Sequence, residues 1–438
     1  MPLFKTIKEK YYEGMKYIDH IYVHSGLISE EANIYSYVNE GVEYLFIEND
    51  TYFNRDGVYG YADDAARFSF YNIAVVEMMI KMDYYPDICH EHDYHAAILP
   101  ALCKLRYSAI EKIRSIKHIL TIHNLAYQGE YDKQVLFDYL SFDYRDYERG
   151  DLRFNDYCNF MKIGIIYADF ITTVSKTYAK EIQTPEFGNK LDVILRYRSK
   201  DLYGIVNGID VEQWDPSTDK LLEANYGVKD AVEKKKANKL ALQRELGLEE
   251  DENKMVLGLI SRLTDQKGLD LVNAILPNLI DGNTQVVFLG TGDRKYEDSF
   301  RYYENAYKGS VCSCIMYDEA RAHKIYAASD ALLVPSLFEP CGLTQLIAMR
   351  YGAAPVVRET GGLKDTVQQY DKYTKQGNGF VFSNYNAHEM MYALKRALST
   401  YAQFEVWLQI SSNAMNSDYS WKNSAHEYIE LYTKLINS

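Results

Sequence analysis

The sequence predicts an α/β protein with two parallel β-sheets, each covered by helices on both faces. Short strands rich in Val, Ile and Leu alternate with helices from about residue 86 onward, and such apolar strands are typical of sheets buried on both sides. The alternation stops at an irregular stretch, residues 209–219, and then begins again. A chain of 438 residues is also too long for one ordinary core, which favours two domains.

The first block supplies the elements of the first domain. Residues 42–50 (VEYLFIEND) predict a strand, but nothing before about residue 85 shows a strand, a glycine loop and a helix in succession. After that point the apolar pattern alternates between strand and helix spacing. In chain order we expect strands at 87–92, 118–123, 169–175 and 202–208, and helices at 93–107, 154–168 and 176–183.

The second block repeats this alternation after a charged helix at 229–247. The last helix carries apolar side chains at helical spacing. We therefore predict domains at 1–217 and 218–419, with a cleft between them and a terminal helix at 420–438. The expected strands are 254–260, 284–290, 311–317, 331–336 and 354–359, and the expected helices are 269–280, 342–352 and one that begins within 360–367.

Composition excludes several functional classes. With 48 basic and 62 acidic residues the net charge is −14, which argues against a nucleic-acid binder because such proteins need a basic face. The six cysteines show neither the density of a disulfide scaffold nor CxxC zinc pairs, so a reduced, cytoplasmic compartment is expected. We see no apolar signal segment and no apolar run near ~18 residues, so neither secretion nor membrane insertion is predicted.

Polar side chains follow many of the predicted strands. In doubly wound sheets, ligands bind at the carboxyl ends of the strands. A structural role is the commoner explanation for any one of these residues, but their clustering at strand ends favours a binding site. The residues are Asp93, His123, Asn124, Asn207, Gly208, Arg262, Lys267 and Glu339.

One strand-end loop carries both Arg262 and Lys267, immediately before a helix. Two cations beside a helix N-terminus are suited to a diphosphate. Gly361 and Gly362, where another helix begins, would let backbone N–H groups approach an anion. The chain contains neither GxGxxG nor the P-loop pattern, which argues against a dehydrogenase and against a kinase or ATPase.

The segment LFEPCGLTQL, residues 337–346, places an acid and a glycine between a strand and a helix. Glu339, an acceptor when ionised, suits sugar hydroxyls, and Gly342 can offer N–H groups to a phosphate. This one loop would therefore hold a sugar together with its leaving group. Cys341 has no evident activating base, so we interpret it as a small packing group that touches the sugar.

Six motifs occur together in a fixed order: HEHDYH, TIHNLAYQGEY, VNGID, SRLTDQKGLDL, LFEPCGLTQL and TGGLKDTV. From about residue 40 to the C-terminus the chain resembles bacterial glycogen synthases and plant starch synthases, which are retaining glucosyltransferases that use ADP-glucose. The resemblance implies the GT-B architecture of two Rossmann-like domains with the donor in the cleft between them. It also implies a terminal helix that returns to the first domain. No metal and no cofactor are expected, since ADP-glucose is the donor substrate and protein cations supply the positive charge.

The resemblance also assigns roles to individual residues. Arg262 and Lys267 match the cations that hold the ADP diphosphate, and Glu339 matches the carboxylate that contacts the donor glucose. His123 would lie against that glucose, so the catalytic set is Glu339, His123, Arg262 and Lys267. The substrate-binding set is Asp93, Tyr94 (where the family usually has Trp), Asn124, Asn207, Tyr317 against adenine, and Cys341, Gly342, Leu343 and Thr344 around sugar and phosphate.

The N-terminus departs from the family pattern. Family members begin with a strand and a K-x-G-G-L loop that contributes a lysine to the donor site, whereas this chain begins MPLFKTIKEKYY. We therefore expect the first domain to be incomplete. Three functions stay open: an ADP-glucose-dependent synthase extending an α-1,4-glucan, an inactive or glucan-binding chain that needs the absent segment, and a related transferase using UDP-glucose. The sequence does not indicate the oligomeric state.

Overall fold

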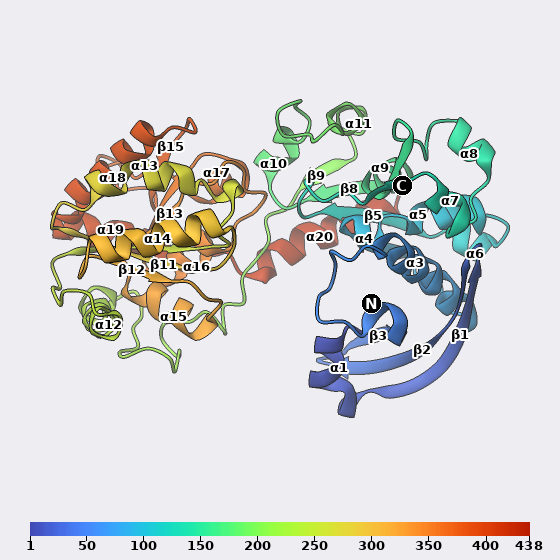
Figure 1. Ribbon diagram of the computed structural model, residues 1–438, viewed down its shortest axis with the longest axis horizontal. Coiled ribbons are helices and arrows are strands. Elements are labelled where there is room, and N and C mark those ends of the chain that lie inside the picture. The colour runs from blue at the N-terminus through green and yellow to red at the C-terminus, as the bar shows by residue number, and fades with distance from the viewer. The chain divides into compact units, whose positions relative to one another are not determined.

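The computed structural model describes residues 1–438, which form two compact units. Each contains a parallel sheet flanked by helices (Figure 1), which confirms the predicted α/β class. The chain passes into the second unit at Gly204, whereas the domain limit predicted from the sequence lies at residue 217. The first unit comprises Met1–Thr173, Ile182–Tyr203 and Glu430–Ser438, and the second comprises Val174–Glu181 and Gly204–Ile429.

The first unit begins with an antiparallel sheet of order β1-β2-β3, of which the sequence predicted only the last strand. Its strands are β1 (Lys16–Ser25), β2 (Ile28–Asn39) and β3 (Val42–Glu48). Alternate residues of β2, including Ala32 and Ile34, are buried, because a strand with one apolar face packs that face on the core. The long helix α3 (Asp64–Lys81) contacts all three strands.

A parallel sheet of order β4-β5-β8-β9 follows, close to the predicted strands. Its members are β4 (Ile88–His92), β5 (Lys117–Ile122), β8 (Phe170–Thr173) and β9 (Leu202–Gly204). The helix predicted over 154–168 is wrong at its start. There β7 (Tyr157–Asn159) pairs with β6 (Glu130–Asp132), and the Asn159 side chain accepts the Lys162 N–H to cap α9 (Phe160–Tyr167).

Short helices connect these strands (Figure 1). The single helix predicted over 93–107 is divided into α4 (Asp93–Ala96), α5 (Leu99–Ala101) and a π-turn, η2 (Leu102–Arg106). The remaining helices of this unit are α1 (Lys5–Tyr11), η1 (Tyr12–Gly14), α2 (Asp50–Phe53), α6 (Glu111–Arg114), α7 (Gln134–Asp138), α8 (Tyr144–Glu148) and α11 (Asp192–Tyr197).

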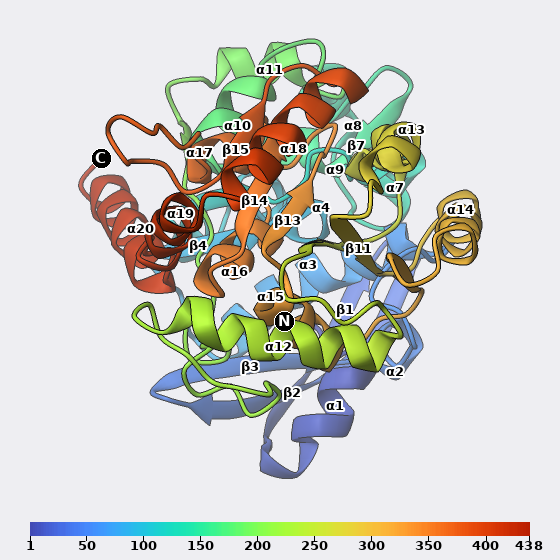
Figure 2. The same cartoon turned by 90° about the vertical axis from the view of Figure 1, so that its left-hand side faces the viewer.

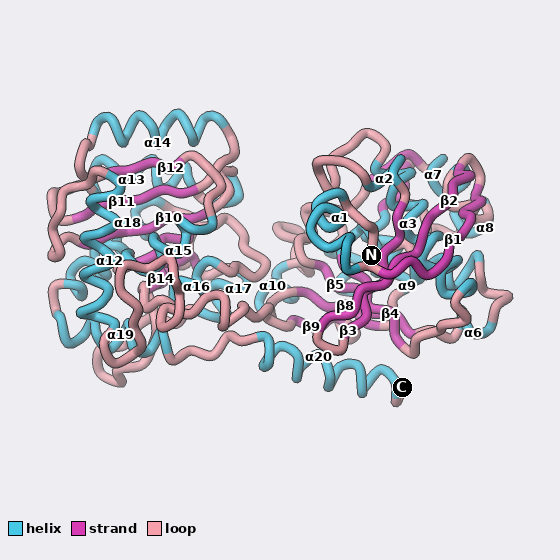
Figure 3. Tube along the Cα trace, turned by 90° about the horizontal axis from the view of Figure 1, so that it is seen from below, coloured by secondary structure: helices cyan, strands magenta, loops and turns pink.

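The second unit is built on six parallel strands in the order β12-β11-β10-β13-β14-β15. Figure 3 shows β12, β11 and β10 following one another in this order. The five strands predicted for this part of the chain are present, and a sixth completes the sheet. They are β10 (Met255–Ile260), β11 (Thr284–Leu289), β12 (Val311–Cys314), β13 (Ala331–Val334), β14 (Ala354–Arg358) and β15 (Phe380–Phe382).

Both faces of this sheet are covered, as the continuous apolar strands require. Val256 packs in one core with α12 (Ala231–Leu246), α15 (Glu319–Ala328) and α16 (Thr344–Arg350). Its neighbour Leu257 packs in the opposite core. That core contains α13 (Leu269–Leu279), α14 (Arg294–Ala306), α18 (Ala387–Tyr401) and α19 (Phe404–Met415). Helices of each core are labelled in Figure 2. The other helices are α10 (Lys176–Glu181), η3 (Asp265–Lys267), α17 (Gly361–Thr366) and α20 (Trp421–Ile436).

Among all these helices, none has the length and apolar character needed to cross a bilayer.

Candidate functional site

In the second unit, two loops at the carboxyl ends of adjacent strands carry the predicted charged residues. Arg262 and Lys267 follow β10, and Glu339 follows β13. Strands β10 and β13 pair directly, in parallel, so the loops that leave them lie side by side. The fold thus brings together residues that are 72 positions apart in sequence, Lys267 and Glu339.

The Lys267 ammonium donates a hydrogen bond to Glu339 Oε2 at 2.6 Å. The hydroxyl of Ser336 donates to the same oxygen at 2.8 Å. The side chains of Lys267 and Glu339 are only 18% and 10% exposed, so water screens this pair less than a surface pair. The carboxylate is therefore held in one orientation by two donors from different loops.

Backbone bonds fix the two loops against each other. The N–H of Leu337 donates to the carbonyl of Gln266 at 2.9 Å, and the Gln266 side-chain amide donates to the carbonyl of Phe338 at 3.1 Å. Gly268 has φ of +68°, and a Cβ there would lie 2.1 Å from the Pro335 carbonyl oxygen. Only glycine permits such a close approach of the two loops.

Arg262, Lys267 and Thr344 line one cavity of about 200 Å³. Glu339 is linked to this cavity through its bond to Lys267. Two cations and the first residue of α16 thus surround a common hollow at the carboxyl end of the sheet, as the diphosphate hypothesis requires. The other lining residues are Leu259, Ile260, Ser261, Leu333, Val334, Pro335 and Ser336.

The glycine pair that opens α17 does not present free amides. The N–H of Gly361 donates to both carboxylate oxygens of Glu181 at 3.1 Å, and the N–H of Gly362 donates to the carbonyl of Glu339 at 3.0 Å. In this structure the Glu181 carboxylate accepts the Gly361 N–H, so the approach of these amides to the anion of a ligand stays a prediction. Gly342, at φ +73°, lies directly before Leu343 and α16.

The remaining predicted residues of this unit differ in their exposure to solvent. The backbone N–H of Asn207 donates to the sulfur of Cys341, and burial raises the pKa of that thiol to about 12, so Cys341 is no thiolate nucleophile at neutral pH. Leu343 is exposed. Tyr317 follows β12 and is 88% exposed; it does not line the cavity of Arg262 and Lys267.

The predicted residues of the first unit meet where β4 and β5 end. Asp93 has a left-handed backbone, φ +57°, and its carboxylate accepts the N–H groups of His123, at 2.8 Å, and of Asn124. Burial raises the pKa of Asp93 to about 6 and lowers the pKa of His123. The ring of His123 also contacts that of His92, with Nε2 2.9 Å from Nδ1. A left-handed non-glycine residue stores strain that is typical of functional sites.

Two other predicted residues of this unit, Tyr94 and Asn124, make packing and hydrogen-bond contacts within the protein itself. Tyr94 is 7% exposed, and its ring packs on His95 and edge-on against Phe68, with centroids 3.8 and 5.8 Å away. The side chain of Asn124 accepts the N–H of Ala126 in a turn. Their contacts with substrate stay predictions.

Three residues that support these groups were not selected from the sequence. Ser336 and Gln266 hold Glu339 and its loop, and His92 positions His123. Ser336 and His92 stand on strand-end segments already selected for other residues, so proximity in sequence was a usable signal for both. Gln266 donates to the carbonyl of Phe338, which lies on another loop. No local sequence pattern indicates this contact.

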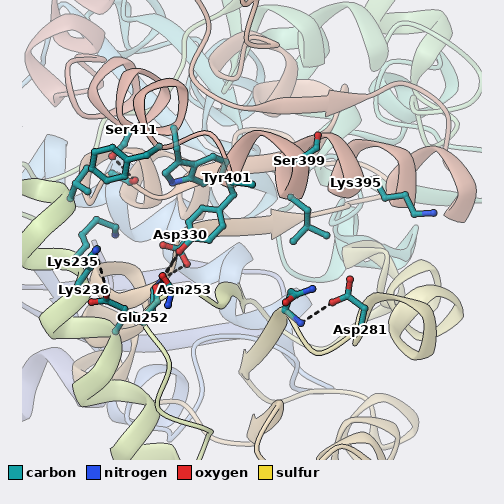
Figure 4. A pocket seen from close by; sticks show the side chains of 18 residues that line it. Lys235, Lys236, Glu252, Asn253, Asp281, Asp330, Lys395, Ser399, Tyr401 and Ser411 are labelled. Carbon is teal, nitrogen blue, oxygen red and sulfur yellow. Dashed lines mark hydrogen bonds and ion pairs between the residues drawn. The ribbon is translucent and has the colours of Figure 1, made fainter.

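A second cavity, of about 720 Å³, lies in the second unit (Figure 4). Asn283 and Asp330 line it and directly precede strands, and Asn253 lies two residues before β10, so the cavity lies at the amino ends of the sheet. Lys239, also in its lining, donates to the carboxylate of Asp330 at 2.7 Å. None of the predicted site residues lines this cavity.

Comparisons with known proteins agree across the whole chain. The family described as "Starch synthase catalytic domain" matches residues 1–197, and the family described as "Glycosyl transferases group 1" matches residues 241–414. The glycogen synthase of Clostridioides difficile (strain 630) is 45% identical over 100% of this chain and 92% of its own length. That of Ligilactobacillus salivarius (strain UCC118) is 43% identical over 100% and 91%. The prediction that an N-terminal loop is absent stays a prediction.

A solved structure also matches nearly the whole chain. The catalytic domain of starch synthase IV from Arabidopsis thaliana, bound to ADP and acarbose, is 36% identical and has a TM-score of 0.88, covering 97% of this chain and 89% of its own. Sucrose-phosphate synthase of Thermosynechococcus elongatus, at 16% identity and a TM-score of 0.56, shares the fold alone. With these relatives matched over its whole length, the chain belongs to the glycogen synthase family of glycosyltransferases and has the GT-B fold.

Proposed function

We propose that this chain transfers glucose from ADP-glucose to the 4-hydroxyl at the non-reducing end of an α-1,4-glucan, with retention of the α configuration. The curated relatives are glycogen synthases, and the matching starch synthase has ADP and acarbose bound. The observation that carries the proposal is the Lys267–Glu339 pair at 2.6 Å, with Arg262 lining the same cavity as Lys267.

Arg262 and Lys267 bind the diphosphate of the donor in this proposal. Both line a cavity at the carboxyl end of the sheet, where α16 begins at Thr344. Positive side chains fixed in advance stabilise negative charge that develops on a leaving group, without reorganisation during the reaction. Tyr317, with its exposed ring, supplies a stacking surface for the adenine base.

Glu339 orients the glucose. Its Oε2 already accepts hydrogen bonds from Lys267 and Ser336, which leaves Oε1 to accept from sugar hydroxyls. A double displacement would need a carboxylate beneath the anomeric carbon. A carboxylate engaged with an ammonium and a hydroxyl is better suited to binding hydroxyls than to attacking carbon.

We therefore favour transfer on one face of the sugar, through a short-lived oxocarbenium ion pair. The bond between the anomeric carbon and the β-phosphate oxygen breaks, and both electrons leave with ADP. The acceptor oxygen attacks the same face, and its proton passes to the leaving phosphate. Arg262 and Lys267 stabilise that phosphate, and the reaction requires neither a cofactor nor an added metal ion.

The test is incorporation of radiolabelled glucose into glycogen, with ADP-glucose and UDP-glucose offered separately and in competition. Efficient incorporation from ADP-glucose, equal with and without added Mg²⁺, supports the proposal. Preference for UDP-glucose would reassign the donor. Glycogen binding without incorporation from either donor would overturn the catalytic assignment and leave a glucan-binding protein.

A further inference from the structure

Three side chains of different ligand chemistry lie on one face of the parallel sheet in the first unit. Cys89 and Glu91 are two residues apart on β4, so they point to the same face. His118 on β5 pairs in register with Cys89. One ligand atom of each residue lies within 4.8 Å of the others. None of the three was selected as part of the transferase site.

The polar atoms of this cluster are incompletely satisfied. Glu91 and His118 are 2% and 0% exposed, and His118 Nδ1 lies 2.7 Å from Glu91 Oε1. The second carboxylate oxygen, Oε2, and the second ring nitrogen, Nε2, have no hydrogen-bond partner. Leaving buried polar atoms unsatisfied destabilises the fold, so an ion pair alone is a poor explanation of this arrangement.

We propose that Cys89, Glu91 and His118 bind one zinc ion that stabilises the first unit. Thiolate, carboxylate and imidazole are all ligands of zinc, and a buried site with protein ligands only is typical of structural zinc. The two anionic ligands neutralise the ion, so the burial of charge is compensated within the site. Ligand atoms in a zinc tetrahedron are ~3.3–3.8 Å apart. The side chains must therefore shift on binding: the 2.7 Å contact between His118 and Glu91 opens, and any wider separation, up to 4.8 Å, closes.

We take Cys103, in the π-helical turn η2, as the fourth ligand; its sulfur lies outside the 4.8 Å cluster and must move toward it on binding. It is 0% exposed and close enough to interact electrostatically with both Cys89 and Glu91. A second thiolate adds one negative charge to the site. The ammonium of Lys104 interacts electrostatically with both Glu91 and Cys103 and offsets that charge. The site thereby connects β4, β5 and η2. Because β4 leads directly to Asp93 and β5 to His123, the ion would brace the strand ends that carry those residues.

The test measures zinc bound to the full-length chain, made without a histidine tag in zinc-supplemented medium and passed through gel filtration. Mass spectrometry of the metal should give about one zinc per chain. Glu91→Gln retains the volume and an acceptor for His118 but removes the charge, and it should reduce the zinc to below about 0.2 per chain. Cys158→Ser is the matched control, since Cys158 is a fully buried cysteine of the same unit outside the cluster, and its sulfur donates to the carbonyl of Asp132.

Cobalt gives a second readout that does not depend on activity, with the absorption expressed per folded chain. Chains produced with Co²⁺ in place of zinc should show thiolate-to-cobalt absorption in the wild type and in Cys158→Ser, and should lose it in Cys89→Ser. Less than about 0.1 zinc per folded wild-type chain would overturn the proposal. Zinc content that Glu91→Gln leaves unchanged would do the same, and Glu91 would then be a protonated or ion-paired core residue.

Discussion

The ammonium of Lys267 lies 2.6 Å from Oε2 of Glu339, across 72 residues of sequence. The pair forms because β10 and β13 are neighbours in the sheet and their carboxyl ends open onto the same edge. Lys267 and Glu339 lie in different loops, one after β10 and the other after β13, and no shared helix or strand connects them. The sheet order therefore creates the charged group that the proposed chemistry needs.

Replacing Lys267 by alanine should lower kcat/KM for ADP-glucose by about 30- to 1,000-fold, or ~2–4 kcal/mol of barrier, because one preorganised donor to the leaving phosphate is lost. The measurement is initial-rate incorporation of glucose into glycogen. Lys236→Ala is the control, since Lys236 forms a half-exposed ion pair with Glu252 away from this cavity. A loss no greater than that of the control would contradict the assignment.

The double variant Lys267→Ala with Glu339→Gln tests whether the two residues act together. Groups in direct contact show non-additive effects, so the loss in kcat/KM should be smaller than the product of the two single losses. Multiplicative losses would mean that the pair at 2.6 Å is not coupled in the reaction.

Gly361→Ala should severely destabilise the loop that carries Glu339. The residue has φ +45°, and a Cβ would lie 1.9 Å from the Glu339 carbonyl oxygen. Gly282→Ala is the control that measures only the strain of a left-handed backbone, without a steric clash, since Gly282 has φ +95° and open space around it. We expect about 1–2 kcal/mol of lost unfolding free energy for the control and clearly more for Gly361→Ala. Denaturant unfolding measures both, and equal losses would contradict the close approach.

The strands of the second unit were predictable because each is a short, continuous apolar run, as in β11 and β13, where every residue is buried. Arg262, Lys267 and Glu339 were predictable because parallel strands place their carboxyl ends at one edge. Their pairing was not predictable from periodicity, since the order β10-β13 depends on a crossover between distant strands.

Other features depend on contacts that no local pattern records. Residues 154–168 were expected to be one helix because their apolar residues suit one, but Asn159 caps α9 and the preceding residues form β7. Likewise, the N–H of Gly361 donates a hydrogen bond to Glu181, a residue 180 positions away in the sequence. Asp93 was selected as a strand-end acid, whereas its left-handed backbone appears only in the structure.

Tyr317→Ala should raise KM for ADP-glucose about fivefold or more, since stacking on a base contributes ~1–3 kcal/mol. The stability of the protein should not change, because the ring is 88% exposed. Tyr373→Ala is matched to it, since Tyr373 is an 84% exposed tyrosine of the same unit that has no predicted role. Steady-state kinetics at varied donor concentration would decide, and equal KM values for the two variants would remove Tyr317 from the site.

Cys341 should behave as a buried thiol. Burial raises its pKa to about 12 from a model-compound value of 9.0, so the native state keeps this proton at pH values where the unfolded chain releases it. The free energy of unfolding should therefore fall as pH rises above about 9, by up to ~1 kcal/mol per pH unit from this group. Cys341→Ser should show a smaller fall, because a serine hydroxyl does not titrate in this range.

Iodoacetamide at pH 8.5 should alkylate Cys341 in urea but spare it in the folded protein, as peptide mass spectrometry would show. Rapid alkylation of the folded protein would mean that the thiol is accessible and ionised, and would contradict its interpretation as a buried packing group.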